Sequence, residues 1–172
     1  MSNSKILSAT LSAIVMLSLT SPALAKGKAV VEVVRINATP QAVFEAIQSY
    51  RNSSALHRKL VSYDGKSAVV DEQLENVPVL GNVHCTWVEK EVPYQRIDYS
   101  MMKSDKFVSG SGSYVISQSA GDCCTLELRS ELESGVKIPF AKEIGAVAAH
   151  KDMKLRLAQI KRMSENTRIA QN

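Results

Sequence analysis

The order of predicted elements constrains this chain more than any single residue does. From Ala29 to about Met163, hydrophobic periodicity and turn residues predict one strand, two short helices, six further strands and one long helix. The strands after the short helices follow one another at hairpin spacing, which indicates an antiparallel meander. A long amphipathic helix laid across a curved sheet of this kind would enclose an apolar cavity. The order therefore predicts an α+β fold that holds a small molecule inside.

Turn and cap residues mark the expected boundaries. Thr39 is a suitable N-cap, and Pro40 suits the first turn of the helix that follows it. The second short helix is expected from Asn52 or Ser53 through His57, and the long helix from Ile138 to about Met163, with a fraying polar tail from Ser164. The expected strands are Ala29–Asn37, Leu60–Tyr63, Ala68–Glu75, Val83–Glu91, Tyr94–Ser104, Phe107–Ser117 and Cys123–Glu133.

The first residues are typical of a secretory signal peptide. Lys5 precedes an apolar run over 6–19, and Ala23-Leu24-Ala25 then supplies the small residues of a cleavage site. The run is shorter than the ~20 residues that span a bilayer. We therefore expect a periplasmic or secreted protein; the alternative is an anchor that stays attached. The expected units are a signal peptide over 1–25, a ligand-binding domain over 26–164 and a polar tail over 165–172.

The cysteines do not indicate a disulfide scaffold or a metal site. Three cysteines are too few for a disulfide-dense chain of 172 residues. Cys123 and Cys124 are adjacent in one predicted strand and face opposite sides, whereas Cys85 lies on another strand. Three free thiols are expected, and one bridge from Cys85 is the alternative. No Cys–His spacing resembles a zinc site, so neither a metal nor a cofactor is expected.

The distribution of charge is informative about partners. A net charge of +4 is too small to indicate nucleic-acid binding. Basic residues gather along the last helix and its tail, over 142–168, which is typical of a solvated helix face. The functional alternative is transient contact with an anionic membrane surface. We expect a monomer, with His57, His84 and His150 at the surface.

The chain resembles the START-like, or helix-grip, superfamily. The segment Ile36–Tyr50 (INATPQAVFEAIQSY) is similar to the start of the first helix in that superfamily. The matching positions are Ala38, Pro40, Val43, Phe44 and Ile47, and the long last helix is the second match. The superfamily includes polyketide cyclase/dehydrase-like and coenzyme Q-binding proteins. The resemblance implies a helix-grip fold whose cavity, under the last helix, takes lipids, sterols, quinones, pigments or polyketides; a minority of members catalyse reactions there.

Strand alternation and helix phase indicate the lining of this cavity. Glu72 shares the parity of Val70 and Leu74, so its carboxylate is expected to point inward, where it would bind a polar headgroup or act as an acid. The alternatives are a solvent-exposed edge strand or a salt bridge. Tyr99 is a second inward polar group. The expected lining residues are Val70, Glu72, Leu74, Trp87, Ile97, Tyr99, Met101, Leu126, Leu128, Gly145, Ala149 and Met153.

Three functions remain open at this point. The first is an exported carrier of a hydrophobic small molecule, which requires a mostly apolar cavity. The second is a cyclase/dehydrase-like enzyme in which Glu72 or Tyr99 moves a proton, although no catalytic motif is present. The third is a protein-interaction module whose cavity is collapsed. The sequence does not identify the ligand.

Overall fold

The computed structural model describes residues 29–54, 57–119, 121–135 and 141–171, without the side chains of 141–145, 148 and 168–171. The predicted signal peptide and the predicted start of the last helix at Ile138 lie outside the described residues. No helix among the described residues is long and apolar enough to cross a membrane.

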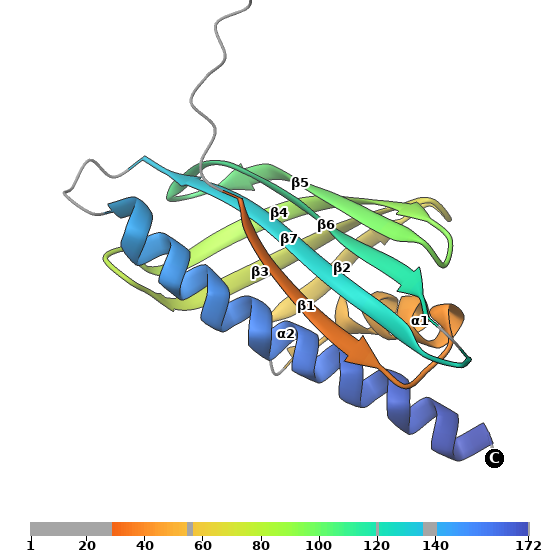
Figure 1. Cartoon of the computed structure of the whole chain (residues 1–172). Helices are drawn as coiled ribbons and strands as arrows, with labels where there is room; N and C mark the ends of the chain where they lie inside the picture. Colours follow the sequence, from red (N-terminus) through yellow and green to blue (C-terminus); the bar gives the residue numbers. More distant parts are fainter. Residues whose placement is uncertain (1–28, 55–56, 120, 136–140, 172) are drawn as a thin grey trace, which may run out of the picture.

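The described residues form a curved antiparallel sheet with helices against one face (Figure 1). The sheet has seven strands in the order β1-β7-β6-β5-β4-β3-β2, so the first strand pairs with the last. This confirms the helix-grip fold. The strands are β1 (Val30–Ile36), β2 (Arg58–Tyr63), β3 (Ser67–Val77), β4 (Gly81–Val92), β5 (Arg96–Ser104), β6 (Phe107–Gln118) and β7 (Cys124–Ser134), and the helices are α1 (Pro40–Tyr50) and α2 (Ala141–Gln171).

Helix α1 begins where the cap residues predict. The Thr39 side chain accepts a hydrogen bond from the Ala42 N–H at 3.3 Å, and Pro40 occupies the first turn. The apolar side chains of α1 recur at helical spacing and are buried against the sheet and α2. The second short helix is predicted through His57 and falls partly on residues 55 and 56, outside the described residues. His57 itself has φ of 48°, so no α-helix includes it.

Helix α2 is longer than the sequence analysis predicts. The polar residues from Ser164 are expected to fray, yet the helix continues to Gln171. Ser164 is fully buried, and its hydroxyl donates to the carbonyl oxygen of Ile160 at 2.8 Å. This bond satisfies the hydroxyl within the helix, and no glycine or proline follows to end the helix.

Two groups of buried side chains flank the space under α2. The larger core joins α1 and the second half of α2 to β1, β5, β6 and β7. The smaller one is built around Val83, Cys85 and Trp87 on β4. Cys85 lies on β4, three strands from Cys124 on β7, and all three cysteines are free. The cavity lies between the two groups.

Candidate functional site

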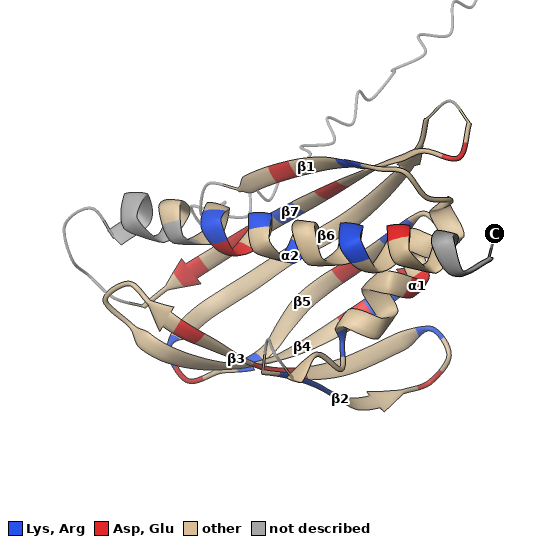
Figure 2. Cartoon of the chain, turned by 90° about the horizontal axis from the view of Figure 1, so that it is seen from below, with Lys and Arg blue, Asp and Glu red and all other residues tan. Residues whose placement is uncertain are grey.

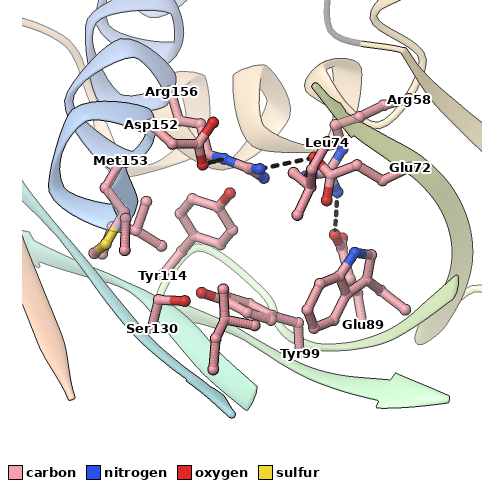
Figure 3. Close-up of a pocket in the computed structure, with 14 residues that line it drawn as sticks. Arg58, Glu72, Leu74, Glu89, Tyr99, Tyr114, Ser130, Asp152, Met153 and Arg156 are labelled. Carbon is pink, nitrogen blue, oxygen red and sulfur yellow. Dashed lines mark hydrogen bonds and ion pairs between the residues drawn. The ribbon is translucent and has the colours of Figure 1, made fainter. Parts of the chain in front are cut away.

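A small cavity of about 50 Å³ lies between α2 and the sheet (Figure 3). Apolar, charged and aromatic side chains alternate around it: Leu74 lies beside Glu72 and Arg58, and Met153 lies beside Asp152 (Figure 3). The apolar side chains are Leu74, Leu128, Leu132, Ala149 and Met153; the charged ones are Arg58, Glu72, Glu89, Asp152 and Arg156; the others are Trp87, Tyr99, Tyr114 and Ser130.

The structure brings together most, but not all, of the residues that the sequence places at the cavity. Those that line it are Glu72, Leu74, Trp87, Tyr99, Leu128, Ala149 and Met153. Ile97 and Leu126 are fully buried in the larger core instead, because α1 and the second half of α2 pack directly on the sheet there. Val70 is also buried but does not line the cavity, and Met101 packs beside Trp87. Gly145 lies in the part of α2 whose side chains are not described.

Charged side chains form a continuous buried network beside the cavity. Glu89 accepts hydrogen bonds from Arg51 Nε and Arg58 Nη2, each at 2.7 Å. Glu72 Oε1 pairs with Arg58 Nη1 at 3.5 Å and with Arg156 Nη2 at 2.8 Å. Arg156 also pairs with Asp152, one turn earlier on α2, at 2.5 Å. The network therefore links the end of α1, strands β2, β3 and β4, and helix α2.

The network keeps its central carboxylate ionised. Burial raises the pKa of the Glu72 carboxyl, but the attraction of Arg156 and Arg58 outweighs this effect, and the pKa lies below its ordinary value. Glu72 and Asp152 in turn outweigh the burial of Arg156 and hold its pKa above the ordinary value. The salt bridge that the sequence analysis left as an alternative for Glu72 is therefore present, and it lies inside the fold.

The aromatic side chains around the cavity differ in how their polar atoms are satisfied. The Tyr99 hydroxyl donates to the carbonyl oxygen of Arg129 at 2.9 Å, and the Tyr99 ring meets Trp87 edge to face at 5.6 Å. The ring fits there because Gly112 on the neighbouring strand has no side chain. Burial raises the pKa of Tyr99, so its hydroxyl stays protonated. The indole Nε1 of Trp87 is buried and has no hydrogen-bond partner within the described residues.

Sequence reasoning missed several charged residues that line the cavity. Arg156 belongs to the basic run assigned to a solvated face, yet its side chain is only 12 % exposed. Its spacing from Met153 and Ile160 places it on the buried stripe of α2, and this signal could have identified it. Glu89 likewise shares the parity of Cys85 and Trp87 on β4. Charged positions thus occur on the strands that α2 crosses as well as along α2 itself (Figure 2), and Glu72 and Glu89 are buried among them.

The histidines lie at the surface, as the sequence predicts. His57 pairs with Glu75 at 3.2 Å, and His84 is exposed. His150 Nδ1 lies 2.6 Å from Glu32 Oε1, and this contact helps to lower the pKa of Glu32, tying the first half of α2 to β1. Among the described residues, no cluster of three or more His, Cys, Asp or Glu side chains is placed to hold a metal ion.

The cavity is smaller and more polar than the sequence analysis expects. A volume of about 50 Å³ holds no more than a few waters. Small residues on α2 are expected to leave space, but Arg156 and Met153 reach into much of it from the same helix face. The lining is mixed, because side chains of the charged network lie in it beside the leucine and methionine side chains.

Comparisons with known proteins agree with the fold. The model of the family described as polyketide cyclase / dehydrase and lipid transport matches residues 28–165. The structure of the Zhui aromatase/cyclase from a Streptomyces species is similar, with a TM-score of 0.70 and 13 % identity, over 80 % of this chain and 93 % of that one. The KanY protein gives a TM-score of 0.65 and 16 % identity over 81 % of this chain and 98 % of that one.

A START superfamily protein from Mycobacterium smegmatis gives a TM-score of 0.62 and 12 % identity over 80 % of this chain and 97 % of that one. Identities this low show a shared fold and nothing about ligands. No curated protein matches the chain. Because the family match spans most of the sequence and the helix-grip fold is present, the chain belongs to the polyketide cyclase/dehydrase and lipid transport family, within the START-like superfamily.

Proposed function

We propose that the protein binds and carries a small molecule with a hydrophobic body, held between α2 and the sheet. The observation that supports this most directly is the composition of the cavity. Leucine and methionine side chains line the cavity together with Trp87, whose indole N–H is buried and has no hydrogen-bond partner within the described residues. The apolar body of a ligand would cover the leucine and methionine side chains, and its polar end would accept a hydrogen bond from the indole N–H of Trp87.

A ligand larger than water requires the cavity to widen. The second half of α2 is held by buried Leu157 and Ile160. In the first half, the described side chains that contact the sheet are smaller or nearer the surface: Ala146 and Ala149 pack on the core, and His150 pairs with Glu32. We expect this half of α2 to move outward when the ligand enters.

A reaction in the cavity is less well supported than binding. An acid or base needs a pKa near the working pH, but the pKa of Glu72 is lowered and that of Tyr99 is raised. The Tyr99 proton is also engaged by the Arg129 carbonyl oxygen. The cyclase/dehydrase-like alternative would therefore need another proton donor, and Tyr114, which lines the same cavity, does not supply a better one because burial raises its pKa as well.

A larger side chain at Ala149 tests whether the cavity is a binding site. Ala149 lines the cavity one turn before Met153. Ala149→Phe is expected to reduce the affinity for an apolar fluorescent probe at least tenfold, because the ring occupies space that the ligand needs. Probe affinity and melting temperature are measured on the same variant.

The exposed neighbour Val147 supplies the control. Val147→Phe adds a ring to the same part of α2 on its solvent side and is expected to leave probe affinity unchanged. A loss of stability of ~1–3 kcal/mol in Ala149→Phe without any change in probe binding would argue against a carrier. That result would favour an interaction module with a collapsed cavity.

We also propose that the protein is exported and that it contacts a membrane surface briefly while it carries its ligand. The signal-peptide pattern that ends at Ala25 supports carriage outside the cytoplasm, and exposed lysines on α2 would suit brief contact with anionic lipid headgroups. The exported protein is expected to begin at or near Lys26. Intact-mass analysis of material recovered from its host measures this, and a folded, exported chain that retains Met1 would contradict it.

A further inference from the structure

We infer that the polar end of the ligand is a neutral hydroxyl group, held between the indole N–H of Trp87 and the carboxylate of Glu72. The inference rests on the proposed function, since it specifies the ligand for the same cavity. It would make the protein a carrier of hydrophobic alcohols or phenols rather than of fatty acids or other amphipathic anions.

The two protein groups are neighbours on one face of the sheet. Trp87 pairs with Val70 across β3 and β4, and Glu72 pairs with Cys85, so Trp87 and Glu72 are diagonal neighbours that point the same way. Both side chains line the cavity, and their residues are only 5 % and 4 % exposed. The indole N–H interacts weakly with Glu72 and helps to lower its pKa, but the two groups do not form a hydrogen bond of good geometry.

The hydrogen-bonding capacity of the pair is incompletely used. Nε1 of Trp87 has no hydrogen-bond partner within the described residues. The ion pairs that Glu72 makes with Arg58 and Arg156 both end on Oε1. A buried indole N–H is costly to leave without a partner, and a carboxylate can accept more hydrogen bonds than its two ion pairs supply, so the geometry asks for a group that can serve both.

A hydroxyl group meets this requirement better than other polar groups do. Its oxygen can accept from Trp87 while its hydrogen is donated to Glu72. An ether or carbonyl oxygen can only accept, and an ammonium group can only donate. A carboxylate or phosphate would meet repulsion from Glu72.

The surrounding charges also disfavour an anion. The network contains the guanidinium groups of Arg51, Arg58 and Arg156, the buried carboxylates of Glu72, Glu89 and Glu91, and the half-exposed carboxylate of Asp152. Each guanidinium is already paired with at least one carboxylate, and the carboxylates are one more in number. The site therefore has no uncompensated positive charge to offer a second anion.

Three probes that share a ten-carbon alkyl chain and differ in their polar end test the inference directly. They are 1-decanol, methyl decyl ether and decanoate. Each is titrated into the full exported protein by calorimetry, below its aggregation concentration. Decanol is expected to bind ~10–100-fold more tightly than either of the others, as for a hydrogen bond to a charged group. Trp87 is the sole tryptophan of the chain, so its fluorescence should change on binding.

Two variants assign the preference to the two residues. Trp87→Phe keeps an aromatic ring but loses the N–H, and it should weaken decanol and ether binding together. Glu72→Gln should reduce the preference for decanol over ether and leave ether binding little changed. Circular dichroism shows whether Glu72→Gln folds. If it does not, the inference is tested by the affinities of the wild-type protein for the three probes and by the effect of Trp87→Phe on them.

The outcomes separate this inference from the proposed function. Binding of ether or decanoate as tight as that of decanol overturns the hydroxyl assignment while leaving the carrier function intact. Equal binding of all three probes, with no effect of Trp87→Phe, means that the pair holds only water and also overturns it. If no probe binds to a wild-type protein that is folded, the proposed function itself fails.

Discussion

Glu89→Gln is expected to lower the free energy of unfolding by ~3–5 kcal/mol, the usual cost of leaving a buried charge without its partner. The residue is 2 % exposed, and its two carboxylate oxygens accept from Arg51 and Arg58. Glutamine keeps the shape but replaces one acceptor with an N–H₂ group that faces a guanidinium. Urea unfolding followed by circular dichroism measures the change.

Glu75→Gln is the matched control, because Glu75 is also a glutamate on a strand with a cationic neighbour. Its side chain is 45 % exposed, and its partner is His57 at 3.2 Å. An exposed pair of this kind contributes ~0–1 kcal/mol. Equal effects of the two substitutions would show that the buried network contributes no more than a surface pair.

Gly112→Ala is expected to destabilise the fold by about 3 kcal/mol, at the upper end for an overpacked core. A Cβ at this position would overlap the Arg129 carbonyl oxygen and the Tyr99 ring. The carbonyl belongs to the sheet backbone and cannot move aside cheaply. Displacement of Tyr99 should also weaken apolar probe binding, because its ring lines the cavity. Melting temperature and probe affinity are the two measurements.

Gly135→Ala is the control for this substitution. Among the described residues, the added methyl group would meet Cγ2 of the exposed Val108 at 3.2 Å, and this side chain can shift toward solvent because the site is exposed. A change within about 0.5 kcal/mol is expected, as for other surface substitutions. If Gly112→Ala proved as mild as Gly135→Ala, the sheet would have to be more deformable at β6 than its close contacts imply.

The parts of the fold that follow local rules could be predicted from the sequence. The cap at Thr39 and Pro40 fixes the start of α1, and strand alternation places Trp87 and Tyr99 on the inner face. The length of α2 was not predicted, because polar residues after Met163 resemble a tail. Their helical state depends on the burial of Ser164, which is a tertiary effect.

The charged half of the site was harder to predict. Lysine, arginine and glutamate are seldom buried, so a basic run is assigned to solvent by default. Arg58 and Arg156 can be buried because they form ion pairs with Glu89 and Glu72. These pairs join strands and helices that are far apart in the sequence, so local sequence patterns do not reveal them. The helix phase of Arg156 and the strand parity of Glu89 do place both residues on buried faces. The pattern is read this way only when the usual exposure of charged residues is ignored.

The pairing of β1 with β7 determines when this chain can fold. Val30 lies opposite Ser130. Strand β1 therefore cannot pair until β7, about a hundred residues later in the chain, has been synthesised. Helix α2, later still, then packs on β1 and α1. Contacts between segments this distant slow folding to milliseconds or longer. A nascent chain therefore cannot complete its sheet until β7 has been synthesised, and its first strand stays without its only neighbour among the described strands until then.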